Sequence, residues 1–302
     1  MGQAAYFEYV GVGNMRVNVV EIIINGLING SIYALISMGL SMQYGVAKIL
    51  NVAHGEFIMI GAFITWALVM AGVHPILALI ICCPIIALVG FVLHRTIYKR
   101  LRDISPSSGA FEGNAMLLSF GIMYVIQSIG QMIWGSNPHR TNFMNTSFVF
   151  LGATVQRNKL VVFAFALGIS ILFYLFLMKS RLGKSIRAAA QDPVAAGIMG
   201  IKINTVMAIC FGLGALLACA AGALLSMYKD LYSVMGMGYT VTAIIVVVLG
   251  GLGSAMGSLI GGFILGLVGY AVSTVNSSLE IIAFYIIIMA LLLVRPKGLL
   301  GR

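Results

Sequence analysis

The chain has 302 residues, of which 61% are hydrophobic and 9% charged, and its formal net charge is +10. A soluble domain has about 25% charged residues, so these side chains cannot cover a water-facing surface. Disordered chains and small disulfide-rich scaffolds are excluded by the same figures. The apolar residues fall in long blocks, whereas a membrane β-barrel needs alternating segments of about ten residues. The composition therefore predicts an all-α, polytopic transmembrane helical bundle.

One crossing takes about 20 residues, so the chain is expected to form about eight spans. In chain order the apolar blocks are 19–44, 57–71, 76–93, 114–134, 160–178, 203–227, 240–272 and 279–294. Broken or re-entrant segments are expected near 45–56 and 240–272. No charged stretch followed by an apolar one precedes the first block, so no cleaved signal peptide is expected.

The basic residues orient these spans. Excess Lys and Arg marks cytoplasmic loops in membrane proteins. The positive net charge is therefore explained by such loops and does not indicate a nucleic-acid partner. The segment 95–102 has four basic residues, read as part of a loop, and 179–202 has five. Both are placed in the cytoplasm with the tail residues Arg295, Lys297 and Arg302, and the loop 135–159 is placed outside.

Parity then constrains the block 240–272. An even number of crossings must separate Lys202 from Arg295, so this block contributes zero or two. Gly250, Gly251 and Gly253 disfavour an uninterrupted helix. We therefore predict a pair of segments that turns near 251–254.

Two breaks are candidates for a transport pathway. Polar groups between apolar blocks are costly in hydrocarbon, and backbone freed at membrane depth must be buried in protein or line a cavity. The segment 60–64 matches 260–264 in four of five positions, and paired interrupted segments indicate a transporter's central site. The candidate pathway residues are Asn51, His54, Gly55, Glu56, Gly250, Gly251, Gly253, Ser254 and Gly257. An ordinary polar turn at 51–56, and plain helix packing through the glycines, remain alternatives.

The segment 179–202 predicts two short helices joined at a corner. Asp192 can cap the second helix, with Pro193 at its first position and Gly200 beyond its end. Ala189, Val194, Ala195 and Ile198 form an apolar face that the segment cannot bury alone. That face needs a partner, either the membrane surface or another protein.

The four cysteines (Cys82, Cys83, Cys210 and Cys219) lie in apolar stretches without metal-ligand spacing. They are interpreted as small core residues, and no metal site is expected. Asn, His and Glu within 51–56 do not supply a full ligand set either.

These segments together resemble the LivH-type permeases of branched-chain amino-acid ABC importers, within a broader group that includes sugar and urea permeases. The resemblance rests on GSIYALISMGLSMQYGVAKILNVAHGEFIMIGAF, RLGKSIRAAAQDPVAAGIMGIKINTVMAICFGLGALLACAAGALL and VVLGGLGSAMGSLIGGFILG. Their order and spacing cover most of residues 20–300. By this resemblance, 1–302 is a single transmembrane permease domain of the bacterial inner membrane.

The resemblance also implies partners. The segment 180–202 is similar to the cytoplasmic coupling loop that docks on an ATP-binding subunit, with the pattern residues Gly183, Arg187, Ala190, Asp192 and Gly200. The expected partners are a second related permease, two ATP-binding subunits, an extracytoplasmic substrate-binding protein and the lipid bilayer. The sequence has no GxxxxGK[ST] phosphate loop, so the chain is not expected to be an enzyme or to hold a cofactor, and ATP is expected to be used by the partner subunits.

Three rival functions stay open at this point. A permease for urea, short amides or other small polar solutes belongs to the same class. A stand-alone secondary transporter or channel would need no ATPase and would leave the 180–202 segment unexplained. An intramembrane enzyme would need paired catalytic groups facing one cavity, which the sequence does not indicate.

Overall fold

The computed structural model describes residues 19–300 except 142, 151–152 and 297. The expectation about a signal peptide falls on residues outside this part. The helices are α1 (Val19–Ala47), α2 (His54–Met70), α3 (Pro75–Leu93), α4 (Lys99–Ile104), α5 (Ser108–Trp134), α6 (Arg157–Lys179), α7 (Arg181–Gln191), α8 (Pro193–Ile198), α9 (Ile203–Leu225), α10 (Met235–Gly250), α11 (Ala255–Ser273) and α12 (Leu279–Val294).

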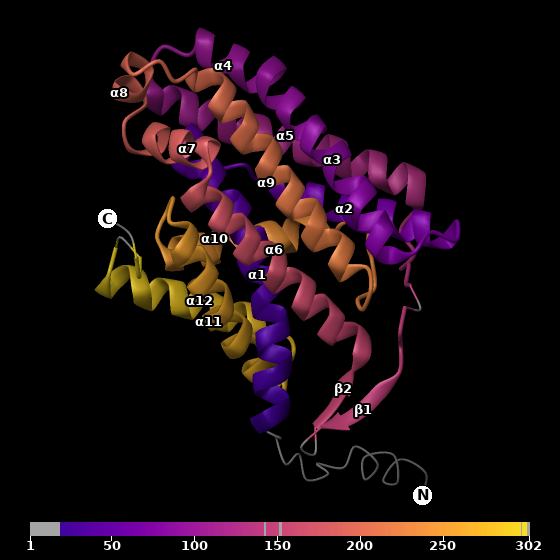
Figure 1. Ribbon diagram of the computed structural model, residues 1–302. Coiled ribbons are helices and arrows are strands. Elements are labelled where there is room, and N and C mark those ends of the chain that lie inside the picture. Colours follow the sequence, from indigo (N-terminus) through magenta and orange to yellow (C-terminus); the bar gives the residue numbers. More distant parts are fainter. Residues whose placement is uncertain (1–18, 142, 151–152, 297, 301–302) are drawn as a thin grey trace, which may run out of the picture.

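The chain forms a helical bundle, which confirms the predicted fold class (Figure 1). Among the described residues, six helical elements are long and apolar enough to cross a membrane, and α2, α10 and α12 are shorter apolar helices. The number of eight spans stays a prediction. α4, α7 and α8 gather at one end of the bundle, which we call the α8 end, and the strands lie at the opposite end, the hairpin end (Figure 1).

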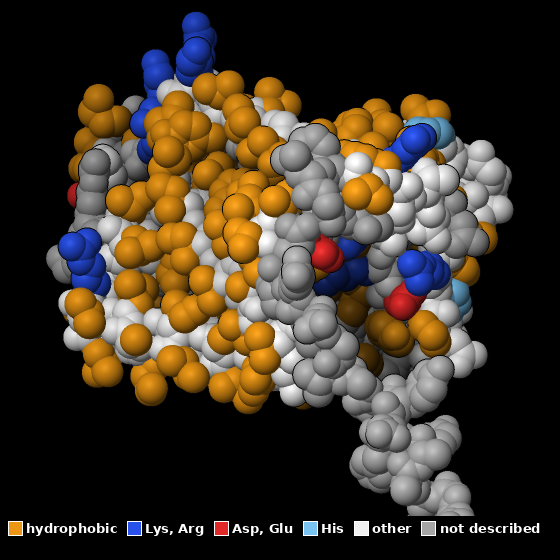
Figure 2. Space-filling view, turned by 90° about the horizontal axis from the view of Figure 1, so that it is seen from below, with side chains coloured by type: hydrophobic (Ala, Val, Ile, Leu, Met, Phe, Trp, Pro, Cys, Tyr) orange, Lys and Arg blue, Asp and Glu red, His pale blue; other side chains and the backbone are white. Residues whose placement is uncertain are grey.

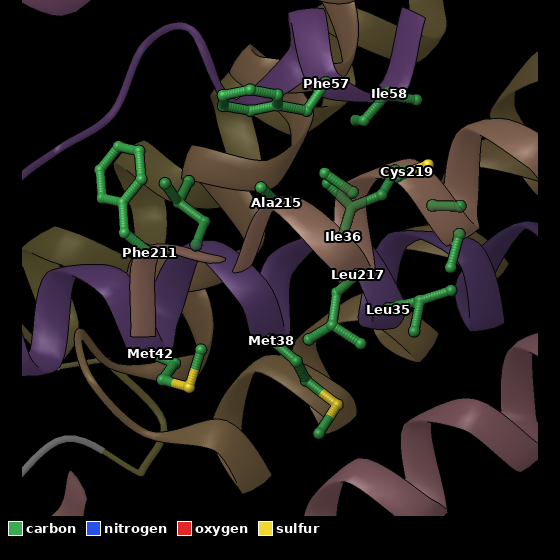
Figure 3. Close-up of a cluster of buried hydrophobic side chains, with 14 of the residues drawn as sticks. Leu35, Ile36, Met38, Met42, Phe57, Ile58, Phe211, Ala215, Leu217 and Cys219 are labelled. Carbon is green, nitrogen blue, oxygen red and sulfur yellow. The ribbon is translucent and has the colours of Figure 1, made fainter. Parts of the chain in front are cut away.

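α1 runs through the bundle and is buried along most of its length. Small residues allow α11 to approach it closely, since a Cβ on Gly262 would lie only 2.6 Å from Cα of Ala34. α1, α2 and α9 supply much of the main core, where Ile36, Phe57 and Phe211 are fully buried (Figure 3). Close backbone approach through small residues is how helices associate where no hydrophobic driving force acts between them.

The outer helices turn large apolar side chains outward. Leu88 on α3, Leu117 and Met132 on α5, and Leu293 on α12 are all exposed. Figure 2 shows hydrophobic side chains spread broadly over one part of the surface. An exposed apolar surface of this extent is normally covered by a membrane or by another protein. The outer helices therefore have the surface expected of helices that face lipid.

Both predicted breaks are present. Helix α1 ends at Ala47 and α2 begins at His54, so the chain is not helical over most of 48–53. Helix α10 ends at Gly250 and α11 begins at Ala255. Gly251 and Gly253 have φ values of 102° and 84°, a conformation that side chains with a Cβ rarely adopt. The two glycines therefore make the turn predicted near 251–254.

Two segments differ from the sequence prediction. The basic segment 95–102 is helical rather than a loop, because a π-helical turn, η1 (His94–Tyr98), joins α3 to α4 without interruption. The sequence between Phe91 and Ile104 contains no glycine or proline that could end the helix. The loop after α5 contains an antiparallel hairpin, in which β1 (Ser147–Phe150) pairs with β2 (Ala153–Gln156). The sequence analysis predicted no strands there.

Candidate functional site

The break before α2 holds three polar side chains in the interior. Asn51, His54 and Glu56 are each 0% exposed. Nε2 of His54 lies 3.1 Å from the carbonyl oxygen of Ile36. Among the described residues, His54 Nδ1, both carboxylate oxygens of Glu56 and both amide atoms of Asn51 have no hydrogen-bond partner. Buried polar groups are normally satisfied, so this cluster fits a place where a polar ligand or water binds.

The cluster lies at mid-height in the bundle. The contact with Ile36 places His54 beside the middle of α1, and about 17 Å of helix, at about 1.5 Å per residue, separates Ile36 from the end of α1. The chain after Ala47 therefore runs back into the bundle before α2 begins. This geometry fits a buried break better than a polar turn at the surface.

Helix α10 closes one side of this cluster. The Gly55 amide donates a 2.8 Å hydrogen bond to Oγ1 of Thr240, and the Thr240 hydroxyl donates to the carbonyl of Val52 at 3.0 Å. A Cβ on Gly55 would overlap the carbonyl oxygen of Gly236, and one on Gly236 would lie 2.6 Å from Cδ of Glu56. The two glycines thus allow the α10 backbone to touch the first turn of α2.

The second predicted set packs differently. Ser254 caps α11 by accepting a 3.1 Å hydrogen bond from the Gly257 amide. A Cβ on Gly250 would lie 2.6 Å from the nitrogen of Ser258, so α10 and α11 meet backbone to backbone. Gly45, near the end of α1, approaches Gly253 in the same way.

The structure does not bring the two sets together. Thr240 contacts the first break, while Gly250 lies about 15 Å further along α10, at about 1.5 Å per residue. The contacts of Gly250, Gly251, Gly253, Ser254 and Gly257 are those of tight helix packing. A pathway role for this second set stays a prediction.

The segment 180–202 has the predicted shape. Ser180 caps α7 by accepting a 2.8 Å hydrogen bond from the Gly183 amide. Asp192 caps α8 by accepting from the amides of Val194 and Ala195 at 2.8 and 3.0 Å. Gly200 has a φ of 86° and lies just beyond α8.

Helix α7 is tied to its own bundle. The guanidinium of Arg187 donates a 3.2 Å hydrogen bond to the carbonyl of Met178 at the end of α6. A Cβ on Gly183 would lie 2.6 Å from the carbonyl oxygen of Phe176. Ala190 packs against the core. Arg187 and Gly183 thus pack α7 against the end of α6.

Helix α8 leaves an apolar surface uncovered. Val194, Ile198 and Met199 are 72%, 82% and 83% exposed, and we call them the α8 patch. Ala195 is also exposed, as predicted. The expectation was wrong for Ala189, which is 1% exposed because α7 buries it against the core.

Sequence reasoning missed other groupings. Thr240 gave one signal, a polar residue within an apolar block, but nothing local linked it to Gly55.

Sγ of Cys219 lies 3.4 Å from Sγ of Cys82, and with Cys83 the three sulfurs lie within 4.8 Å of one another. Cys82 and Cys219 are 137 residues apart in sequence, so spacing rules could not reveal this buried thiol cluster.

An apolar bundle interrupted by a buried polar break, with a capped helix pair at one end, defines a multi-pass membrane protein of the permease class. The family model described as "Branched-chain amino acid transport system / permease component" matches residues 22–295. The chain belongs to this family, which confirms the resemblance noted in the sequence.

Two curated relatives match nearly the whole chain. It is 31% identical over 296 residues to the high-affinity branched-chain amino acid transport system permease protein BraD of Pseudomonas aeruginosa, covering 93% of this chain and 95% of BraD. It is 31% identical over 305 residues to the corresponding protein LivH of Escherichia coli K12, covering 92% and 94%. PsaBC from Streptococcus pneumoniae in complex with Fab aligns over 97% of this chain and 96% of its own, with a TM-score of 0.48 and 11% identity, a likeness too weak to carry an argument.

Proposed function

We propose that this chain is the membrane-spanning permease subunit of an ATP-driven ABC importer for branched-chain amino acids in the bacterial inner membrane. The observation that carries the proposal is the capped α7–α8 pair, which presents the α8 patch at one end of a chain that belongs to this permease family. BraD and LivH, which match nearly the whole chain, are both named as branched-chain amino acid permeases.

The α8 patch is the proposed docking surface for an ATP-binding subunit. Val194, Ile198 and Met199 are apolar and exposed, and basic residues of α7 lie next to them in sequence. A second related permease, two ATP-binding subunits and an extracytoplasmic substrate-binding protein complete the proposed assembly. The substrate-binding protein would contact the hairpin end, and the α8 end would face the cytoplasm, where positive loops are retained.

ATP hydrolysis belongs to the partners in this proposal. Closure of the two ATP-binding subunits displaces α8 and α7, and the contacts of Arg187 and Gly183 pass that displacement to α6. The permease then moves between an outward-open and an inward-open state, and the substrate and partners shift this equilibrium by binding the two states differently.

The proposed translocation path passes the break before α2. Asn51, His54 and Glu56 offer polar atoms that no described residue satisfies, at mid-height of the bundle. Gly55 keeps this break in contact with α10, so a movement of α10 changes the environment of Glu56.

The proposal is tested by uptake of radiolabelled leucine into cells that lack their own transporter for it. The chain is expressed alone and with its neighbouring ATPase, second permease and binding-protein genes. Uptake only with the full set supports the proposal. Uptake by this chain alone would favour a secondary carrier. ATP-dependent uptake of urea or short amides, but not of leucine, would keep the class and overturn the substrate.

A further inference from the structure

A cavity of about 250 Å³ opens near the end of the bundle opposite α8. It lies where the segment after α9, the start of α10, and the start of α12 surround α1. Its lining includes Tyr33, Lys229, Met235, Tyr239, Glu280 and Phe284. Figure 2 looks onto this end of the molecule and shows acidic and basic side chains together in a recess. Pockets for drug-sized ligands start at about 300 Å³, so this cavity suits a smaller molecule.

Two side chains of opposite charge line the cavity. Within the described part of the chain, Lys229 and Glu280 form no ion pair within 4.0 Å. Nζ of Lys229 lies 5.9 Å from the centre of the Tyr239 ring, and Oε1 of Glu280 accepts a 3.2 Å hydrogen bond from the Tyr33 hydroxyl. The pKa of Lys229 is raised above its ordinary value, chiefly by Tyr239 and also by Glu280, against the effect of burial.

Apolar and aromatic side chains form much of the remaining wall, which Thr242 and Ser277 also line. Phe284 meets Tyr33 edge to face, with ring centres 6.2 Å apart, and Met235 and Ile281 also line the cavity. A ligand that fits this lining has one negative group, one positive group and a short apolar side chain.

We propose that this cavity binds a zwitterionic aliphatic α-amino acid, with Lys229 facing its carboxylate, Glu280 facing its ammonium group and the aromatic wall covering its side chain. The inference rests on the proposed transport function and identifies the residues that select the substrate. Solutes without charged groups, such as urea or sugars, would leave both Lys229 and Glu280 without an oppositely charged partner. Leaving partly buried charges unpaired is costly, so the cavity discriminates against them.

The cavity adjoins the buried break. Tyr239 lines the cavity, and the side-chain oxygen of the next residue, Thr240, accepts a hydrogen bond from the Gly55 amide. A ligand in the cavity thus contacts the same turn of α10 that closes the Asn51–Glu56 segment. The cavity is placed to receive the amino acid before it passes the break.

The test measures ligand binding to the purified complex of the full-length chain with its permease and ATPase partners in nanodiscs, without the binding protein. The ligands are leucine, leucinamide, which lacks the carboxylate, and N-acetyl-leucine, which lacks the ammonium group. The chain variants are Lys229→Met, Lys229→Arg and Glu280→Gln. Lys179→Met and Glu112→Gln, exposed positions outside the cavity lining, are the matched controls.

The wild-type complex is expected to bind leucine at least about tenfold more tightly than either analogue, the effect of one charged hydrogen bond. Lys229→Met is expected to weaken leucine binding about tenfold and to leave the affinity for leucinamide unchanged. Glu280→Gln is expected to weaken leucine binding about tenfold and to leave the affinity for N-acetyl-leucine unchanged. Lys229→Arg is expected to restore most of the affinity for leucine. Wild-type affinity in both charge-removing variants would overturn the inference, as would the absence of saturable leucine binding to the wild-type complex. If the wild-type full set fails to take up any amino acid, the proposed function itself falls.

Discussion

The backbone amide of Gly55 and the side-chain oxygen of Thr240 are joined by a 2.8 Å hydrogen bond. This bond links the first turn of α2 to α10 across the centre of the bundle. Because Thr240 also donates to the carbonyl of Val52, one hydroxyl satisfies a backbone group in the break and another in the first turn of α2. Glu56, the residue after Gly55, has no hydrogen-bond partner for either carboxylate oxygen among the described residues.

Replacing Thr240 by Val is expected to destabilise the protein by about 1–3 kcal/mol, since a buried amide and a buried carbonyl each lose a partner. Thr242→Val is the matched control, because among the described residues the Thr242 hydroxyl bonds within its own helix, to the carbonyl of Gly238 at 3.1 Å. Thermal unfolding in detergent measures both. Equal unfolding temperatures for the two variants would show that the link between α2 and α10 is not stabilising.

Glu56→Gln separates function from stability. The buried carboxylate has no partner among the described residues, so the neutral amide removes an uncompensated buried charge and the unfolding temperature is expected to stay equal or rise. Leucine uptake by the full set is expected to fall at least about tenfold if a charged hydrogen bond to substrate or water is lost. Glu112→Gln, on the exposed side of α5, should transport normally. Normal uptake with Glu56→Gln would remove Glu56 from the path.

Ile198→Asp tests the α8 patch. Ile198 is 82% exposed, so an aspartate there is expected to change the stability of the isolated chain by less than about 0.5 kcal/mol. A charge in an apolar docking surface should instead prevent the ATP-binding subunits from copurifying. Val275→Asp, 74% exposed in the turn between α11 and α12, is the control. Normal copurification with Ile198→Asp would place the docking surface elsewhere.

Arg187→Ala tests how α7 passes motion to α6. The lost bond to the Met178 carbonyl is an exposed helix-end interaction worth about 0.3–1 kcal/mol, so the chain should fold and bind its ATPases. Uptake per ATP hydrolysed is expected to fall several-fold, because one of the contacts that hold α7 to the end of α6 is lost. Lys184→Ala, also exposed on α7, should leave this ratio unchanged. A lower ratio in both variants would point to a general effect of charge.

The sequence predicted those features whose cause is local. Asp192 and Pro193 determine the start of α8 through caps and fixed backbone angles, and Gly251 and Gly253 determine the turn after α10. The block 279–294 coincides with α12 because its apolar run has abrupt ends.

Features that depend on tertiary contact were not predictable in this way. Lys229 and Glu280 belong to separate segments, and only the tertiary fold places both in the lining of one cavity. Charge counting likewise could not show that Nζ of Lys159, in the loop placed outside, donates to Oδ1 of Asn25 on α1 at 2.9 Å. A lysine held inside the protein carries little information on which side of the membrane its loop lies.

The most direct test of the account follows leucine and ATP together in proteoliposomes that contain the purified complex and the binding protein. The wild-type complex is expected to accumulate leucine while hydrolysing ATP, Glu56→Gln to hydrolyse ATP without accumulating leucine, and Ile198→Asp to do neither. Leucine accumulation by vesicles that contain this chain without the ATP-binding subunits would contradict the account.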